Sequence, residues 1–371
     1  MERPDFIKHY SQIEPKQPVQ PPGSPEQFAF HTAYSRATGM SRLRVNHIRL
    51  TPGTRMSPPG AMRDEEEFVY VIEGTPDMWC DGFLYRLNEG DGVGFKDRTG
   101  IGHTFLNNTD RDVRLFVIGE AARYGTKLHH PLDQAQNMQL RKMGKLWEDI
   151  PARERGPHDA LTDARRGRPS PDNAKKSGKP GYAVHWKDIQ KQPWSYPGSS
   201  ETHGLHSKFA RHLGLGRIGV HHEVLPPGTR TSWPHAERDE EEFVFVLEGS
   251  PDAWIDGVMH RLKPGDGVGF PDQTGVSHVF MNNTDKPVRL LVAGEASRVR
   301  AKVNYPLHPK RNQEIGEMYW ADMPKRALGP HDGIPDLLRD KIAKGEMKKV
   351  AAPKMAKPPA AKPKPKAKGK K

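Results

Sequence analysis

The chain contains a single cysteine, Cys80, so no disulfide can form within it, and a reducing compartment is favoured. The N-terminal stretch lacks the basic segment followed by an apolar segment that is typical of a secretory signal. No apolar run approaches the length of a membrane-spanning helix, about 20 residues. We therefore expect a cytoplasmic protein without a membrane partner.

The positive charge of the chain is unevenly distributed. The net charge is +12, but the segment from Lys341 onward holds twelve lysines and one acidic residue, Glu346, which leaves about +1 for the preceding residues. Lys, Pro and Ala bury little apolar surface, so we expect a disordered Lys/Pro/Ala-rich tail over residues 333–371. Such a tail predicts weak, non-specific binding to a polyanion such as nucleic acid; the alternative is a solvated tail that only favours solubility.

One long repeat organises the rest of the chain. An offset of 175 residues (228 − 53) places "DEEEFVYVIEG" on "DEEEFVFVLEG" and "GDGVGF" on a second "GDGVGF", without a gap between Gly53 and Glu120. A repeat of this length indicates a duplicated domain. We expect a first domain over residues 1–160, a polar linker rich in Pro and Gly over 161–181, and a second domain over 182–332.

Strand signals dominate both copies. Segments such as "EFVFVLEG" and "VRLLVAGE" are short apolar runs rich in Val, Phe and Leu. Asp81-Gly82 and Asp256-Gly257 each separate two such runs, as in a two-residue hairpin turn. The pattern predicts an all-β protein whose copies are antiparallel sandwiches or closed barrels.

The copies differ within one otherwise matching stretch. "SWPHAERDEEEF", residues 232–243, carries His235 and Glu237 where "SPPGAMRDEEEF", residues 57–68, carries Gly60 and Met62. Side chains two residues apart in a strand share a face, so His235 and Glu237 are expected to point the same way. The second copy therefore has chemistry at this stretch that the first copy lacks.

Two further residues complete this candidate site. Glu242, at the start of the next strand, can face the pair, and alternation selects it over Glu241; His278 begins another strand. Buried carboxylates are costly unless they are paired or bound to a metal. The set predicted to bind one divalent metal ion per chain is His235, Glu237, Glu242 and His278.

The first copy keeps only part of this set. Glu67 and His103 occupy the positions of Glu242 and His278. Two ligands rarely hold a divalent ion against water, so we expect a degenerate first site without metal. The first domain is then expected to pack against the second.

The second copy resembles the cupin superfamily. The residues that carry the resemblance are Gly228, His235, Glu237, Glu242 and Gly249 for the first cupin motif, and Gly265, Gly275, His278 and Asn282 for the second. Two features depart from the family pattern: Glu237 stands where the second histidine is usual, and residues 271–275 form a longer run. The resemblance implies a bicupin, with two tandem double-stranded β-helix barrels of jelly-roll type.

The metal and the role of Glu237 remain open at this stage. Two imidazoles with carboxylates suit Mn, Fe, Zn, Co or Ni. Either all four residues bind the ion, or His235, Glu242 and His278 form a three-residue face and Glu237 is a catalytic general base. Trp233, Phe280 and Asn282 are candidates for a substrate pocket beside the ion.

Several functions are compatible with these residues, because a fold does not determine a reaction. The first hypothesis is a metal-dependent oxidoreductase, lyase or isomerase that acts on a small, oxygen-rich metabolite at the second barrel; dioxygenase and decarboxylase chemistry are both included. The alternatives are a non-catalytic protein that binds a small ligand, and an interaction protein tethered to a polyanion by its tail. A homo-oligomer is compatible with each of them.

Overall fold

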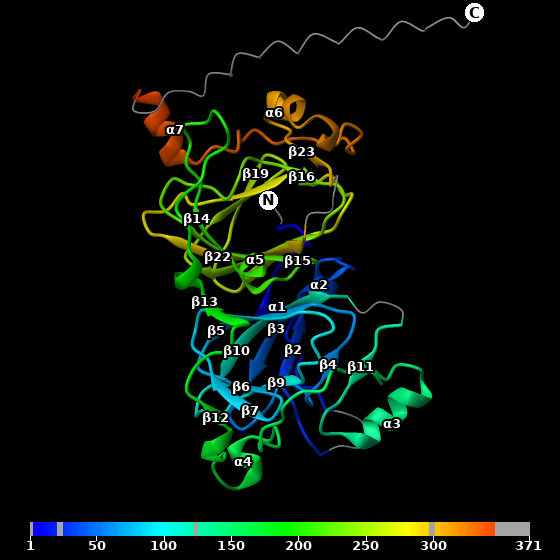
Figure 1. Ribbon diagram of the computed structural model, residues 1–371. Coiled ribbons are helices and arrows are strands. Elements are labelled where there is room, and N and C mark those ends of the chain that lie inside the picture. Colours follow the sequence, from blue (N-terminus) through cyan, green and yellow to red (C-terminus); the bar gives the residue numbers. More distant parts are fainter. Residues whose placement is uncertain (1–2, 21–24, 122–124, 297–300, 346–371) are drawn as a thin grey trace, which may run out of the picture.

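The computed structural model describes residues 3–20, 25–121, 125–296 and 301–345 of the chain (Figure 1). Two β-barrels lie one above the other, and their strands repeat at the predicted offset: β5 spans Glu67–Glu73 and β17 spans Glu242–Glu248. The predicted all-β fold with a duplicated barrel is therefore confirmed. The part of the predicted tail from residue 346 onward lies outside the described residues.

The first barrel is built from a six-stranded sheet, a four-stranded sheet and a strand pair. The larger sheet has the order β13 (Ala183–His185), β8 (Asp91–Phe95), β5, β10 (Val113–Glu120), β3 (Leu43–Leu50) and β2 (Phe30–Ala33). The smaller sheet has the order β12 (Lys175–Lys176), β7 (Phe83–Arg86), β6 (Asp77–Cys80) and β9 (His103–Leu106). The pair consists of β4 (Ala61–Met62) and β11 (Leu128–His129).

The second barrel repeats this plan. Its larger sheet has the order β1 (Ile7–His9), β20 (Asp266–Phe270), β17, β22 (Val288–Glu295), β15 (Ile218–Leu225) and β14 (Leu205–Lys208). Its smaller sheet has the order β19 (Val258–Arg261), β18 (Asp252–Ile255) and β21 (His278–Met281), and its strand pair consists of β16 (Ala236–Glu237) and β23 (Val303–Asn304).

The predicted hairpin turns are present in both barrels. Asp81 and Gly82 connect β6 to β7, and Asp256 and Gly257 connect β18 to β19. All four residues have positive φ angles, between 46° and 90°, as a two-residue turn of the primed type requires. Asp tolerates this left-handed conformation better than most residues with a side chain, which explains the Asp-Gly pairs.

One edge strand of each barrel comes from outside the repeat that forms that barrel. The N-terminal strand β1 pairs with β20 of the second barrel, while β13, which follows the predicted linker, pairs with β8 of the first. The linker also contributes β12, which runs parallel to β7. The predicted domain limits at residues 160 and 182 therefore do not separate the two barrels completely, because strands outside these limits join the sheets of each barrel.

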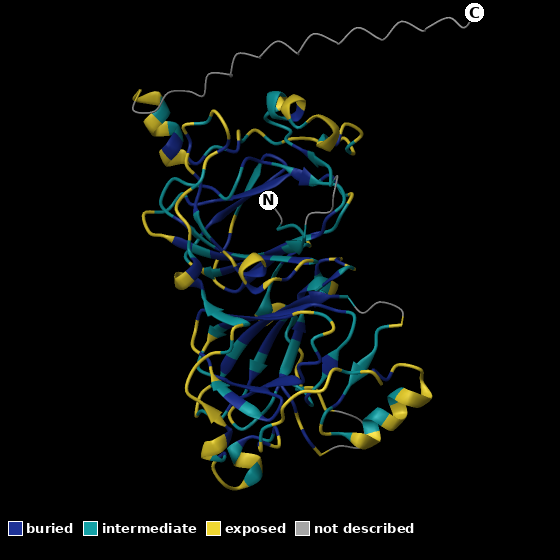
Figure 2. Cartoon of the chain, viewed as in Figure 1, coloured by how far each residue is buried: buried dark blue, intermediate teal, exposed yellow. Residues whose placement is uncertain are grey.

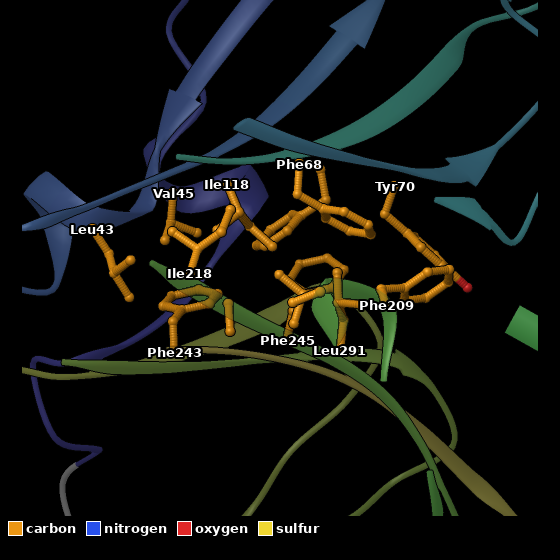
Figure 3. Packing of buried hydrophobic residues seen from close by; sticks show 14 of the residues in the cluster. Leu43, Val45, Phe68, Tyr70, Ile118, Phe209, Ile218, Phe243, Phe245 and Leu291 are labelled. Atoms are coloured by element: carbon orange, nitrogen blue, oxygen red, sulfur yellow. The ribbon is translucent and has the colours of Figure 1, made fainter. Parts of the chain in front are cut away.

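A hydrophobic core lies between the two barrels, in addition to the core inside each barrel. Figure 3 shows side chains of β3 and β5, such as Val45 and Phe68, facing side chains of β17 and β22, such as Phe243 and Leu291. Phe209 packs between them from helix α5 (Phe209–Leu213). Burial of such aromatic and aliphatic surface is the main stabilising term in association. The six-stranded sheets therefore meet face to face, and the opposite face of each sheet lines a barrel interior.

Short helices connect the strands and lie mostly at the periphery, where Figure 2 shows the exposed residues. They are α1 (Tyr10–Ile13), α2 (Tyr34–Ala37), α3 (Gln134–Lys142), α4 (Asp163–Arg166), η1 (Asp172–Ala174), η2 (Trp186–Ile189), α6 (Pro309–Glu314), η3 (Gly316–Met318) and α7 (Asp336–Ala343). None of the helices in the described ranges is long and apolar enough to span a bilayer.

Helix α7 corrects the predicted start of the tail. The prediction of disorder from residue 333 is wrong over Asp336–Ala343, which is helical, with Leu338 buried. The lysine-rich residues that follow dominate the composition of residues 333–371 and conceal the leucines of this helix. Its two leucines give it an apolar side, and Leu337 lies beside Gly228 of the second barrel.

Candidate metal centre

Backbone pairing brings the two histidines of the second barrel together. His235 and His278 form an antiparallel bridge, in which His278 N–H donates to the His235 carbonyl at 2.9 Å and the reciprocal bond is 3.2 Å. Residues paired in this way project their side chains from the same face of the sheet. The two imidazole rings lie 5.0 Å apart.

Glu242 at the start of β17 completes a cluster of three. The ligand atoms of His235, Glu242 and His278 all lie within 4.8 Å of one another. His278 is also held from one side, because the ring of Phe270 stacks on it at 3.6 Å. Three converging donors on rigid strands are the arrangement that a metal centre needs.

The hydrogen bonds of both rings favour the tautomer that binds a metal. Nδ1 of His235 lies 2.9 Å from the Trp233 carbonyl, and Nδ1 of His278 lies 3.2 Å from the Val276 carbonyl. A carbonyl only accepts, so Nδ1 carries the hydrogen in the neutral ring and Nε2 presents its lone pair.

Nε2 of His278 also lies 3.2 Å from a carboxylate oxygen of Glu242. Two acceptor atoms at this distance repel each other unless a proton or a cation lies near them both. Burial raises the pKa of Glu242, but when Nε2 of His278 carries the proton, its hydrogen bond and charge outweigh burial and lower the pKa overall. The donor set therefore fits a divalent ion.

Glu237 lies beside this cluster and not within it. Its carboxylate is 3.9 Å from Nε2 of His235. Burial and then the negative charges of Glu242 and Glu240 raise the pKa of Glu237 well above its ordinary value. A cation at the cluster would act in the opposite direction and favour the ionised form. The position is compatible with both roles predicted for Glu237, fourth ligand or base.

The neighbouring acidic residues of the "DEEE" run face different surroundings. The carboxylate of Glu241 leaves the barrel interior and accepts hydrogen bonds from backbone N–H groups of Ser41, Arg42 and Leu43 in the first barrel. Glu242, one residue further, points to the cluster. The alternation of side chains along a strand produces this division.

In the first barrel, Glu67 and His103 keep the same mutual geometry. Nε2 of His103 lies 3.1 Å from Glu67, and Phe95 stacks on His103 at 3.6 Å. The positive charge beside this pair is supplied by Arg44, whose guanidinium donates to Glu67 at 2.8 Å. Burial raises the pKa of Glu67, but His103 and Arg44 together outweigh it and lower the pKa overall.

Sequence reasoning missed Arg44, although a signal was available. The offset of 175 places Gly219 at the position of Arg44 (44 + 175). A guanidinium thus lies beside the carboxylate in the first barrel, where the second barrel has no side chain. Gly60 and Met62, which replace His235 and Glu237, line the same cavity as Arg44.

The three predicted pocket residues have different surroundings. Trp233 is buried in an aromatic stack, 4.0 Å from Tyr196 and 4.2 Å from His308. Phe280 is buried in the interior core of the second barrel. Asn282 donates to two backbone carbonyls and accepts from Thr284, so its amide is engaged within a turn.

Two further polar residues on β15 were missed. His221 and Glu223 alternate with Val220 and His222, which face the other barrel, so they lie on the interior side of the strand. Burial and the Glu242 charge raise the pKa of Glu223 to about 8. The period-2 pattern of residues 218–225 could have revealed this pair.

The barrels and their motifs agree with known proteins. The cupin domain family matches residues 46–119 and 221–294. Protein SchB of Streptomyces halstedii is 38% identical over 76 residues, 20% of this chain and 51% of SchB, so the chain spans about half the length of this relative.

Solved structures are similar in fold at low identity. A formate complex of Lactobacillus farciminis oxalate decarboxylase is 14% identical with a TM-score of 0.50, covering 87% of this chain and 95% of that chain. A variant of Bacillus subtilis oxalate decarboxylase is 13% identical with the same TM-score, covering 86% and 84%. With a cupin match in each barrel, the chain belongs to the cupin superfamily and is a two-domain bicupin.

Proposed function

We propose that the second barrel binds one divalent metal ion through His235, Glu242 and His278 and is an enzyme site for a small, oxygen-rich metabolite. The observation that supports this most directly is the convergence of the three ligand atoms within 4.8 Å. Two imidazoles and one carboxylate suit Mn, Fe, Co, Ni or Zn. When bound, the ion would supply positive charge that attracts and polarises oxygen atoms of the metabolite.

Residues of this chain would orient the metal ligands and accept a proton from the substrate. The Trp233 and Val276 carbonyls orient the two imidazoles, and Phe270 keeps His278 in position. Three protein ligands leave coordination positions for a substrate, as in catalytic metal sites. Glu237, 3.9 Å from His235, would accept a proton from such a substrate or join the ligands. Dioxygenase, decarboxylase, lyase and isomerase reactions are all compatible with this set.

The size of the metabolite is limited by the surroundings. Glu237, Glu242, Phe270 and His278 border a cavity of about 10 Å³. That volume is close to what one water molecule needs. A metabolite of several atoms therefore requires side chains around the site to move, and small substrates are favoured.

Metal analysis of the purified full-length chain tests the proposal. We expect about one divalent ion per chain by elemental analysis, which His278→Ala abolishes. The matched variant His103→Ala changes the corresponding residue of the first barrel and should leave metal content unchanged. Two ions per chain, or equal losses in both variants, would contradict the assignment to the second barrel.

A non-catalytic role in binding a small ligand is the second candidate. It is favoured by the small volume of the cavity beside Glu242 and His278, about 10 Å³, which leaves room for little more than one water molecule. Water-proton relaxation of the Mn(II)-loaded protein separates the two roles. Exchangeable water on the ion supports an enzyme site, whereas its absence supports a closed binding or structural centre.

The lysine-rich segment carries a separate proposal that rests on the sequence alone. We propose that it binds polyanions weakly and without sequence preference. Deleting residues 346–371 should remove binding to a duplex DNA probe at low salt and leave the stability of the barrels unchanged. If the truncated chain binds the probe equally well, the barrels carry the basic surface instead.

A further inference from the structure

The interior of the first barrel contains a cavity of about 300 Å³. This volume is at the lower end of the range for small-molecule sites. Apolar side chains of Ile48, Met56 and Leu128 form part of its wall, and its polar groups include Arg44, Glu67 and the four residues described below. The cavity is built from the same positions as the metal centre of the second barrel but has a different chemistry.

At this cavity the carboxylate of Glu67 is already paired with a cation of the protein. Arg44 donates to Glu67 at 2.8 Å and lies 3.7 Å from Glu65. The guanidinium can lie there because residue 119 is glycine: a Cβ at Gly119 would approach an Arg44 nitrogen to 2.9 Å. An anionic ligand would meet the Glu67 carboxylate, and a cation would meet Arg44. An uncharged ligand avoids both costs.

Two imidazoles at the cavity offer acceptor nitrogens. Nδ1 of His130 lies 2.9 Å from the Pro59 carbonyl, so in the neutral ring Nδ1 donates and Nε2 is an acceptor. His130 is only 7% exposed, and its Nε2 is buried and has no hydrogen-bond partner among the described residues. Such a buried acceptor is available to a ligand in the cavity. His31 likewise directs Nε2 to the Met56 carbonyl at 3.2 Å, which leaves Nδ1 as an acceptor. Both rings line the cavity.

Donor groups also line the cavity. The amides of Asn46, on β3, and Gln136, on α3, line the cavity. Amide groups and acceptor imidazoles together match hydroxyl groups, because each hydroxyl both donates and accepts. The apolar wall suits a carbon skeleton, and a ring loses less conformational entropy on binding than an open chain.

We infer that the first barrel binds, without metal, an uncharged ring compound that carries at least two hydroxyl groups. Its hydroxyls donate to His130 and His31 and accept from Asn46 and Gln136, and its ring contacts Met56 and Leu128. This site is independent of the metal function proposed for the second barrel. Sugar-like rings and hydroxylated aromatic rings share the chemistry, and the choice between them is an outcome of the test.

Calorimetric titration of the full-length chain, stripped of metal by a chelator, tests the inference with three probes. The probes are myo-inositol for an aliphatic ring, resorcinol for an aromatic ring, and malonate as an anionic control. We expect saturable binding of one of the two neutral probes at about one site per chain, and no binding of malonate. Binding of malonate alone, or of none of the three, would overturn the inference.

Three variants locate the site. Asn46→Leu replaces an amide by an apolar group of similar size and should weaken binding about tenfold or more. Gln136→Ala, on the peripheral helix α3, carries little risk to folding and should weaken it about threefold or more. His221→Leu changes the residue of the second barrel that corresponds to Asn46 and should leave affinity unchanged. If His221→Leu is the damaging change, the probe occupies the second barrel and the inference is wrong.

Discussion

Glu66 of the first barrel and Glu241 of the second are equivalent residues (66 + 175), and each binds the backbone of the other barrel. Glu66 accepts from the N–H groups of Gly216, Arg217 and Ile218, with shortest distances of 2.8, 2.8 and 3.3 Å. Glu241 accepts from the corresponding residues Ser41, Arg42 and Leu43 at 2.8 to 2.9 Å. Both carboxylates are buried, so the hydrophobic interface of Figure 3 is flanked by two charged anchors.

Glu66→Gln should destabilise the protein by about 3 kcal/mol, because an amide cannot accept three N–H groups as a carboxylate does and leaves buried donors unpaired. Chemical denaturation at pH 7 measures the change. Glu73→Gln is the matched surface control, since Glu73 is exposed and its ion pair with Arg114 contributes about 1 kcal/mol or less. Equal losses in the two variants would show that the buried anchor adds nothing.

The first barrel should acquire a metal site when its ligand set is restored. The variant Arg44→Gly, Gly60→His, Met62→Glu reproduces the second barrel, and we expect it to bind two metal ions per chain. Gly60 has space for a side chain, because the nearest atom to a Cβ there is 3.5 Å away. Keeping Arg44 while making the other two changes should leave metal content at one, because the guanidinium already neutralises Glu67. Elemental analysis decides between these outcomes.

Glu237 can be assigned by two substitutions. If it is a ligand, Glu237→Gln weakens metal binding and lowers the stability of the metal-loaded protein. If it is a base, the same variant retains the ion and loses turnover by roughly 10²–10⁴-fold. Glu237→His restores the histidine pair of other cupins and should retain metal under both roles, with activity lost under the base role. Unchanged metal content and activity in both variants would remove Glu237 from the site.

The interface histidines make stability sensitive to acid. Burial, and then the charge of Arg289, lowers the pKa of His222 to about 3; burial and Arg114 do the same for His47. Between the unfolded pKa of about 6.5 and the folded pKa, only the unfolded state binds the proton. The stabilising contribution is therefore complete above about pH 6.5 and is lost as the pH falls toward 3.

His222→Phe should remove the part of this dependence that comes from His222. Neither ring nitrogen of His222 has a partner among the described residues, so the substitution breaks no hydrogen bond there and keeps the stacking on Trp186 at 4.2 Å. The effect of the substitution on the free energy of unfolding should be about 2 kcal/mol more stabilising at pH 5 than at pH 7.5, because pH 5 lies 1.5 units below the unfolded pKa. His212→Gln, at an exposed position, should show no such gain in denaturation curves at the two pH values.

The repeat made much of this structure predictable. The offset of 175 residues, the Asp-Gly turns and the alternation of side chains depend on local spacing, and they predicted two barrels and the position of Glu242 relative to Glu241. What remained hidden depends on contacts between distant segments. Arg44 lies near Glu67 only because β3 is brought beside the carboxylate, and the pairing of β1 with β20 joins residues that no local pattern connects. The helix α7 was hidden for another reason, since composition averaged over a tail conceals a short apolar segment.

The exchange of edge strands has a consequence for synthesis on the ribosome. Strand β13 is translated after its partner β8 and after the other strands of the first barrel, since β8 ends at Phe95 and β13 begins at Ala183. It can therefore pair as soon as it emerges. Strand β1, in contrast, ends at His9 and must await Asp266, the first residue of β20. At about 5–20 residues per second, that interval is on the order of ten to fifty seconds. The earliest described strand to be translated is thus among the last to find its partner, and the second barrel closes only when most of the polypeptide has been made.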